Sequence, residues 1–177
     1  MRTFKYFSGP FFFVILTVAL SCQDKQSQEE LAKFKQAELL KATNIQLAQK
    51  FYKYLDELNF DTLRTICDPD IKVFYESGDP VSFVDMEPFI KSFYDAFPDY
   101  KHQIDDIYAT GDKVIIRLTF TGTHINDFLE IKSTGNKFKY KGIHIFQFAN
   151  KKAINFWAVE DELGMMTQLG MELKQKK

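Results

Sequence analysis

The sequence has no excess of charge of either sign. Its 177 residues include 23 lysines and arginines against 24 aspartates and glutamates, a formal net charge of −1. This balance provides no electrostatic basis for binding nucleic acid, so no nucleic-acid partner is expected. A content of 45 % apolar and 27 % charged residues excludes a disordered or collagen-like chain, and the length is that of one ordinary domain.

Sequence motifs for several common chemistries are also missing. The three histidines, His102, His124 and His144, stand at unrelated spacings and form no metal-site pattern. We find no glycine-rich phosphate loop, no serine nucleophile elbow and no cysteine–histidine pair. The sequence therefore predicts neither a metal nor a cofactor.

Long apolar runs are scarce, and the one that exists lies near the N-terminus. Arg2 and Lys5 precede the segment 11–20, in which Thr17 is the only polar residue. A helix that spans a bilayer needs about 20 apolar residues. This shorter run is typical of a secretory signal instead.

The end of this segment contains a second signal. Ala19-Leu20-Ser21 runs directly into Cys22, which is similar to the bacterial lipobox, where the cysteine after a small residue is diacylated and becomes the mature N-terminus. Ala19 stands where leucine is usual, and a plain signal peptide that ends beside a cysteine is the alternative. We predict a lipoprotein signal peptide at 1–21, a polar tether at 22–36 and a folded domain at 37–177. The lipid on Cys22 would anchor the exported protein to the membrane of the bacterial cell envelope.

Cysteine is otherwise represented by Cys67 alone, so the mature chain has no partner for an intramolecular disulfide. The segment 62–67 has the pattern of a short helix with Cys67 on its apolar side. No histidine or helix N-terminus stands nearby to lower the pKa of the thiol. We interpret Cys67 as a buried packing residue.

The hydrophobic periodicity changes once along the domain. Apolar residues recur at helical spacing over 43–58, 62–67 and 85–97, with a short strand at 71–75. From residue 100 the period becomes two, which predicts strands at 100–110, 114–123, 137–149 and 153–159, before a last helix from Leu163. This order predicts an α+β fold. We expect a cone-shaped, curved antiparallel sheet wrapped around the long N-terminal helix and two shorter helices.

Aromatic residues are unusually abundant. The chain contains 19 phenylalanines, 8 tyrosines and one tryptophan, together 16 % of its residues. An apolar cavity inside the cone would account for so many rings, and a solid core would account for them nearly as well.

Five short motifs indicate a family. In chain order they are Ala96-Phe97-Pro98-Asp99, Gly111-Asp112-Lys113-Val114, Thr121-Gly122-Thr123-His124, Lys141-Gly142-Ile143-His144-Ile145-Phe146, and Trp157-Ala158-Val159-Glu160-Asp161-Glu162-Leu163-Gly164 with Gln168-Leu169-Gly170. Over residues 44–170 their order and spacing resemble the SnoaL-like group (polyketide cyclase or ester cyclase-like proteins) of the nuclear transport factor 2-like superfamily. The resemblance implies a cystatin-like cone, a cavity near the open end of its sheet, and homodimers through the sheet's outer face.

The activities of these relatives vary. Some close the rings of anthracycline polyketides by an aldol reaction, while others in the superfamily isomerise ketosteroids, open epoxides or only bind a ligand, so fold alone settles no chemistry. In the cyclases, a histidine in the long penultimate strand and an acid–base aspartate in the last strand face the cavity. These positions fall on His144 and Ala158 here. Because a methyl group cannot carry a proton, the known cyclase mechanism is in question for this chain.

The candidate catalytic residues are His144, Glu160 and Asp161. By strand alternation His144 shares a face with Phe146 and other aromatic residues, where desolvation lowers its pKa and leaves a neutral ring able to act as a base. A core histidine bonded to a carbonyl or a tyrosine is the alternative. Glu160 shares the face of Ala158 and is the carboxylate that could replace the missing aspartate. Asp161 either takes that role or caps the last helix.

A ligand pocket is predicted from the same faces. Its expected lining residues are Phe51, Tyr75, Phe93, Phe97, His124, Tyr140, Phe146, Phe156 and Ala158. His124 would gate the mouth of the cone or be merely exposed, and His102 is expected at a surface or edge position. On the opposite face of strand 137–149, Ile143 and Ile145 suit solvent or a partner subunit.

These observations favour a lipid-anchored domain that binds a small apolar molecule in an aromatic cone. Proton transfer of the cyclase or isomerase type is one hypothesis, with His144 as base or hydrogen-bond donor, aided by Glu160 and Tyr140. The alternatives are a non-catalytic ligand-binding domain, or a dimerising interaction module of the cell envelope with a solid cone. Whether the protein is an enzyme stays open at this point.

The anchor is testable by removing the thiol that would carry it. We expect Cys22→Ser to move the protein from the membrane fraction to the soluble fraction, as measured by cell fractionation and immunoblotting. Cys67→Ala, which removes the other thiol, serves as the control and should stay with the membrane. Unchanged partitioning of Cys22→Ser would contradict the prediction.

Overall fold

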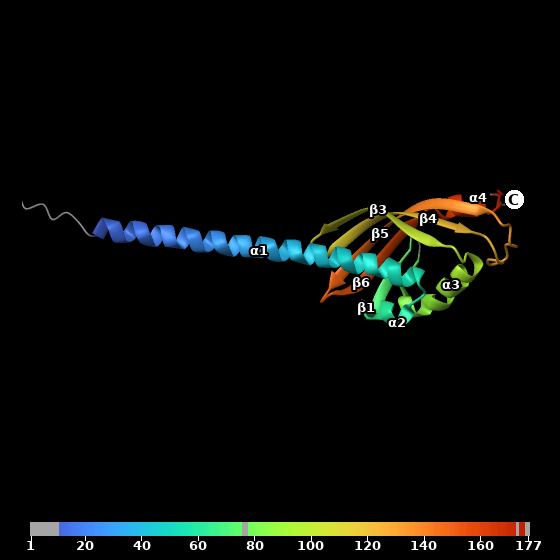
Figure 1. The fold of residues 1–177 in the computed structure, drawn as a ribbon, viewed down its shortest axis with the longest axis horizontal. Helices are drawn as coiled ribbons and strands as arrows, with labels where there is room; N and C mark the ends of the chain where they lie inside the picture. The colour runs from blue at the N-terminus through green and yellow to red at the C-terminus, as the bar shows by residue number, and fades with distance from the viewer. Residues whose placement is uncertain (1–10, 76–77, 173, 176–177) are drawn as a thin grey trace, which may run out of the picture. The chain divides into compact units, whose positions relative to one another are not determined.

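A computed structural model of the chain describes residues 11–75, 78–172 and 174–175 (Figure 1). Side chains are described from residue 25 onward, so the first half of the predicted signal peptide and the side chain of Cys22 lie outside the described residues. The chain divides into two compact units, residues 1–39 and 40–177.

The described residues of the first unit belong to helix α1 (Phe11–Asp56). The sequence predicted a polar tether at 22–36 and a regular helix only from residue 43, whereas the helix already includes these residues. The segment 23–41 lacks proline and glycine and is rich in glutamine, glutamate, lysine and alanine, which favour helix without any packing. In the part of the chain that the structure describes, no helix is long and apolar enough to cross a membrane.

In the second unit, α1 contributes one apolar face to the core. Its buried residues include Ala48, Phe51, Tyr52 and Leu55. After α1 ends, the chain reverses at Leu58, which has a φ of 53°. Asn59 caps helix α2 (Phe60–Arg64), because its side-chain oxygen accepts the N–H of Thr62.

Helix α3 (Phe83–Ala96) begins two residues before the predicted position. The Ser82 hydroxyl accepts the N–H groups of Val84 and Asp85, so it satisfies two of the donors that a helix N-terminus leaves free. The predicted short helix over 62–67 is also shorter, since Cys67 begins strand β1 instead. Cys67 is buried as expected, and burial raises the pKa of its thiol to about 12.

Six strands form one sheet in the order β2-β1-β6-β5-β4-β3. Their bounds are β1 (Cys67–Phe74), β2 (Val81–Ser82), β3 (Lys101–Thr110), β4 (Lys113–Thr123), β5 (Lys137–Ala149) and β6 (Lys152–Glu160), and helix α4 (Glu162–Gln168) follows. Neighbouring strands are antiparallel except β1 and β6, which run parallel. The α+β fold with a curved sheet is confirmed, and the one parallel pair is a feature that the sequence pattern did not predict.

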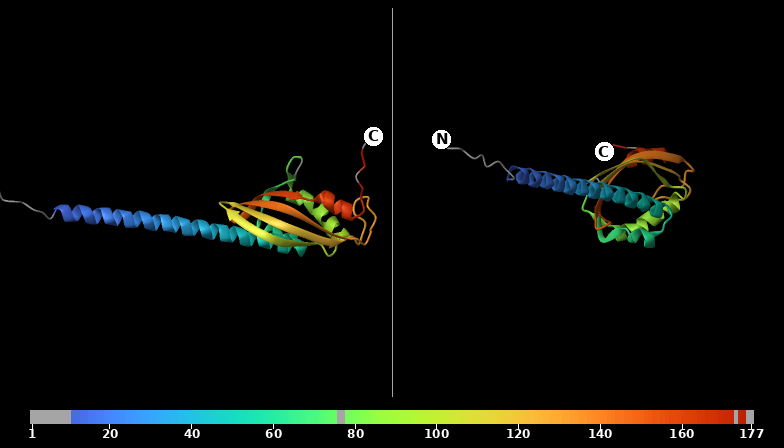
Figure 2. Two further views of the ribbon diagram at one scale, coloured as in Figure 1. Left: turned by 90° about the horizontal axis from the view of Figure 1, so that it is seen from above. Right: turned by 60° about the vertical axis from the view of Figure 1, so that its left-hand side comes forward.

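The sheet curves over α3 and the part of α1 that belongs to the second unit (Figure 2). Along β5, side chains alternate strictly between a buried inner face and a solvent-facing outer face. The inner residues are Phe138, Tyr140, Gly142, His144, Phe146 and Phe148. This alternation confirms the predicted period of two along β5 and directs its row of aromatic side chains inward.

Candidate functional site

A cavity of about 670 Å³ lies between the inner face of the sheet and the helices α1 and α3. Aromatic residues are the largest group in its wall, beside methionines, aliphatic residues, two histidines and three carboxylates. The aromatic members are Phe51, Tyr52, Tyr75, Phe83, Phe89, Phe93, Tyr94, Tyr100, Phe128, Tyr140 and Phe156. The cone is therefore not solid, and its volume is within the range that holds a drug-sized molecule.

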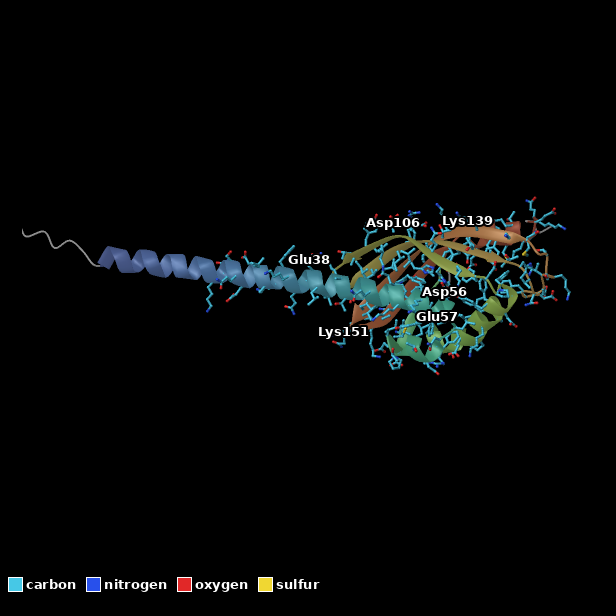
Figure 3. The ribbon with its side chains drawn as sticks, viewed as in Figure 1. Glu38, Asp56, Glu57, Asp106, Lys139 and Lys151 are labelled. Atoms are coloured by element: carbon cyan, nitrogen blue, oxygen red, sulfur yellow. The ribbon has the colours of Figure 1, made fainter. Side chains whose placement is uncertain are left out.

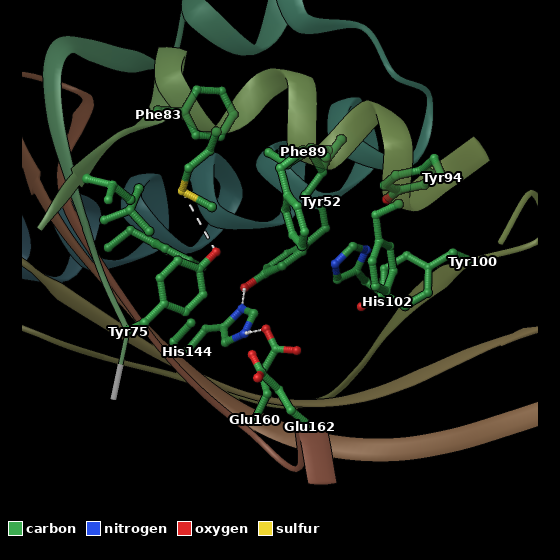
Figure 4. Close-up of a pocket in the computed structure, with 18 of the residues that line it drawn as sticks. Tyr52, Tyr75, Phe83, Phe89, Tyr94, Tyr100, His102, His144, Glu160 and Glu162 are labelled. Atoms are coloured by element: carbon green, nitrogen blue, oxygen red, sulfur yellow. Dashed lines mark hydrogen bonds and ion pairs between the residues drawn. The ribbon is translucent and has the colours of Figure 1, made fainter. Parts of the chain in front are cut away.

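A chain of hydrogen bonds runs along one wall of this cavity (Figure 4). The Tyr52 hydroxyl lies 2.8 Å from Nδ1 of His144, and Nε2 of His144 lies 2.9 Å from Oε1 of Glu160. The other oxygen of Glu160 accepts the Tyr140 hydroxyl at 3.0 Å, and the Tyr140 and Tyr100 oxygens are 2.8 Å apart. Residues from α1, β5 and β6, with Tyr100 just before β3, thus meet in one network.

The carboxylate of Glu160 determines the direction of every bond in this network. An ionised carboxylate only accepts hydrogen bonds, so Nε2 of His144 and the Tyr140 hydroxyl both donate to it. Nδ1 of a neutral His144 then accepts the hydrogen bond that the Tyr52 hydroxyl donates. Tyr100 likewise donates to Tyr140. Both ring nitrogens of His144 are therefore occupied in the resting site.

The electrostatics agree with a neutral imidazole beside an ionised carboxylate. Burial lowers the pKa of His144, and its hydrogen bond to Glu160 offsets that effect only in part. Burial alone would raise the pKa of Glu160, but the hydrogen bonds from His144 and Tyr140 outweigh it and hold the pKa below its ordinary value. The two side chains are 4 % and 18 % exposed, so little solvent screens them.

Two small residues allow Glu160 to reach His144. His144 stands opposite Ala158 in the β5–β6 ladder, and Gly142 stands opposite Glu160. A Cβ at Gly142 would lie 2.8 Å from the carbonyl oxygen of Val159 and 3.0 Å from Cγ of Glu160. The glycine thus gives the glutamate side chain room to lie across β5 toward the imidazole.

A second carboxylate–imidazole pair lies in the same cavity region. Nδ1 of His102 is 2.6 Å from Oδ1 of Asp56, and the Tyr94 hydroxyl donates to the same oxygen at 2.9 Å. Burial alone would raise the pKa of Asp56, but the hydrogen bonds from His102 and Tyr94 lower it. The Tyr52 ring lies between the two imidazoles, with its centroid 5.0 Å from His102 and 6.0 Å from His144 (Figure 4).

Most of the predicted site residues meet at the cavity. Those that line it are Phe51, Tyr75, Phe93, Tyr140, His144, Phe156, Ala158 and Glu160. Asp161 does not line it. Its carboxylate accepts the N–H of Gly164 at 2.9 Å and caps α4, which was the alternative considered for it.

Three predicted pocket residues lie in the packed core instead, each 0 % exposed. Phe97 is enclosed by other rings, Phe138 among them, and Phe146 packs against Phe51 and Phe156. His124 neither gates the mouth nor is exposed, because its ring packs on Phe97 and its Nδ1 lies 3.1 Å from the Thr134 hydroxyl. Alternation identified the inward face correctly but could not distinguish cavity from core along it.

Sequence reasoning missed Tyr52, Asp56 and Tyr100 and misplaced His102. His102 is not at a surface position, since its side chain is only 5 % exposed. The available signal was the spacing of Tyr52 and Asp56, which places both on one face of α1. Among the described residues, no group of three or more histidine, cysteine, aspartate or glutamate side chains is placed to hold a metal ion.

A curved six-stranded sheet over one long and three short helices, with a cavity inside, defines an α+β cone of the nuclear transport factor 2-like type. The model of the SnoaL-like polyketide cyclase family matches residues 45–169. The chain therefore belongs to the SnoaL-like polyketide cyclase family. No curated protein matches it by sequence.

Solved structures of similar fold include several from this family. AclR of Streptomyces galilaeus, a candidate hydroxylase, has a TM-score of 0.68 at 25 % identity, over 73 % of this chain and 97 % of that chain. A candidate polyketide cyclase from Bacillus cereus has a TM-score of 0.62 at 26 % identity, over 74 % and 83 %. IdmH of Streptomyces antibioticus, also a candidate polyketide cyclase, has a TM-score of 0.66 at 23 % identity, over 72 % and 99 %. The last likeness concerns the fold alone.

The lowered pKa of His144 predicts a pH-dependent stability. Because the unfolded chain binds a proton at this site more readily than the folded one, the free energy of unfolding should fall as the pH drops below about 6.5, by at most ~1.4 kcal/mol per pH unit. Urea unfolding at pH 7.5, 6.5 and 5.5 measures this loss. His144→Gln can keep both hydrogen bonds without titrating and should show a smaller loss. An identical pH dependence in the two proteins would be the contrary result.

Proposed function

We propose that this protein binds a small, neutral, mostly apolar molecule in its cavity and transfers protons on it, as a cyclase or isomerase does. The observation that carries the proposal is the His144–Glu160 pair, bonded to Tyr52 and Tyr140, on the wall of a 670 Å³ aromatic cavity. Buried imidazole–carboxylate pairs in a cavity are typical of acid–base sites. Family membership supports the same reaction class.

The charge of the wall supports a neutral ligand. Three acidic residues, Asp85, Glu160 and Glu162, are among the described residues that line the cavity, and none of those residues is lysine or arginine. A fatty acid or a phosphate ester would meet no countercharge there. An aromatic or alicyclic ketone offers rings to the apolar wall and one oxygen to the hydrogen-bonded network.

The Tyr52–His144–Glu160 chain would exchange a proton with that oxygen. When an enol is converted to a ketone, the O–H proton passes to the Tyr52 oxygen while the Tyr52 proton passes to Nδ1 of His144. The Glu160 carboxylate, already bonded to Nε2, stabilises the resulting imidazolium. The reverse transfer, which converts ketone to enol, starts from the His144 imidazolium: its Nδ1 proton passes to Tyr52 as the Tyr52 proton passes to the carbonyl oxygen. Glu160 would thus serve in place of the cyclase aspartate, from a position two residues beyond Ala158.

Location and assembly form part of the proposal. The sequence of residues 1–22 supports export and membrane anchoring through a lipid on Cys22. For the sheet's outer face we propose a homodimer interface, supported by the exposed apolar residues Tyr108, Ile143 and Val159, which are 64 %, 49 % and 56 % exposed. A non-catalytic module that only binds a ligand or a second copy is the alternative function, and this apolar face favours its dimerising form.

Turnover is testable with 2-tetralone, a neutral bicyclic ketone with acidic protons next to its carbonyl. We expect the full-length protein in mild detergent to accelerate exchange of these protons in D₂O, followed by NMR. His144→Ala and Glu160→Gln should each lower the catalysed rate by about 10²-fold or more, because general acid–base groups contribute that much.

Glu57→Gln is the matched control, since Glu57 is an exposed carboxylate next to Asp56 (Figure 3), and it should keep the full rate. Melting temperatures close to that of wild type would establish that each variant is folded. A folded His144→Ala protein with full activity, or a wild-type rate equal to that of buffer, would refute the catalytic proposal.

The dimer is testable by placing a charge in the outer face. We expect native mass spectrometry to find wild-type dimers and Ile143→Lys monomers, because a buried unpaired ammonium is costly at an interface. Val84→Lys replaces an apolar residue that is 55 % exposed on α3 and should stay dimeric. Monomeric wild-type protein would count against this interface.

A further inference from the structure

The His102–Asp56 pair differs from the His144–Glu160 pair in one respect that matters for chemistry. Both nitrogens of His144 are engaged, one by Tyr52 and one by Glu160. On His102 only Nδ1 is engaged, by Asp56, and Nε2 has no hydrogen-bond partner among the described residues. His102 lines the cavity, and its Nε2, which has no partner among these residues, is not fully buried. This nitrogen is therefore open to a ligand.

Asp56 determines which tautomer His102 adopts. Its oxygens accept the Nδ1–H of His102 at 2.6 Å, the backbone N–H of His102 at 3.4 Å and the Tyr94 hydroxyl at 2.9 Å. Because the carboxylate can only accept, the neutral ring has its proton on Nδ1 and its lone pair on Nε2. Tyr94 holds the carboxylate in place, as a third group orients the base in catalytic triads.

The position of the ring suits a role complementary to that of His144. His102 packs on Tyr52 and Tyr100, with ring centroids 5.0 Å away in both cases, and meets Phe120 at 5.4 Å. His144 also packs on Tyr52 and Phe120, so a ligand that reaches the Tyr52 hydroxyl lies within reach of both imidazoles. The conversion of a ketone to its enol moves two protons, one at carbon and one at oxygen. In the proposed function, the Tyr52–His144–Glu160 chain moves the proton at the oxygen.

We propose that His102 is the residue that exchanges the carbon-bound proton, with Asp56 and Tyr94 as its positioning residues. Nε2 takes a proton from the carbon next to the carbonyl, the electron pair of the C–H bond forms the carbon–carbon double bond, and the carbonyl electrons move to the oxygen. That oxygen takes the Tyr52 proton, which Nδ1 of the protonated His144 replaces. The proton returns from Nε2 to the same or a conjugated carbon. The inferred substrate class is therefore a neutral ring compound with an enolisable ketone. This step rests on the function proposed above.

The 2-tetralone exchange assay tests the role of His102 directly. His102→Asn keeps an N–H toward Asp56 but cannot accept a proton, and we expect it to lower the exchange rate by about 10²-fold while 2-tetralone still binds, as shown by line broadening in the same spectra. His102→Ala should be equally slow and should regain activity in proportion to added imidazole, because the small base fills the space of the missing ring. Asp56→Asn should lower the rate less, and Glu57→Gln should not lower it.

The outcomes separate this inference from the function on which it rests. A wild-type protein that neither binds nor exchanges 2-tetralone would refute both. If His144→Ala and Glu160→Gln are slow but folded His102→Asn exchanges at the wild-type rate, only the role of His102 is refuted. A His102→Ala rate that imidazole leaves unchanged would refute it as well, since a purely structural histidine gives no such rescue.

Discussion

The site depends on one partly buried hydrogen bond, the 2.9 Å contact between the His144 imidazole and the Glu160 carboxylate. Taking an ionised carboxylate out of water costs several kcal/mol unless donors replace the lost hydration. Glu160 receives two such donors, from His144 and Tyr140, and the Tyr52 and Tyr100 hydroxyls complete the network. Once the carboxylate is ionised, the tautomer of His144 and the direction of each hydroxyl follow from it.

The backbone makes this contact sterically feasible. Gly142 and Ala158 leave space on the inner face of β5 and β6, and the longer side chain of Glu160 crosses that space to meet His144. The resemblance to the cyclases implies an aspartate at the position of Ala158. In the proposed function Glu160 takes its place, one inward-facing position further along the strand and with one more methylene group.

Two imidazole–carboxylate pairs lie within one aromatic cone, so apolar rings and ionisable groups stand side by side at the cavity. In the proposed function, its rings favour a neutral, apolar ligand, and the ionisable groups beside them move protons. The pairs also differ from each other. Both ring nitrogens of His144 have hydrogen-bond partners, whereas Nε2 of His102 has none among the described residues. An uncharged ketone is the kind of molecule that both halves could accommodate together.

Periodicity in the sequence was sufficient to predict the order of all the elements except β2, the α+β class and the inward face of β5, because these depend on neighbours close along the chain. The family motifs located His144, and alternation placed Glu160 on its side of the sheet. The parallel pairing of β1 with β6, the burial of Phe97, Phe146 and His124 in solid core, and the Asp56–His102 contact were decided only by the tertiary structure. Asp56 and His102 are separated by 46 residues, and curvature of the sheet over α1 brings them together. Local sequence patterns carry no information about contacts between residues so far apart in the chain, so only the tertiary structure revealed the Asp56–His102 pair.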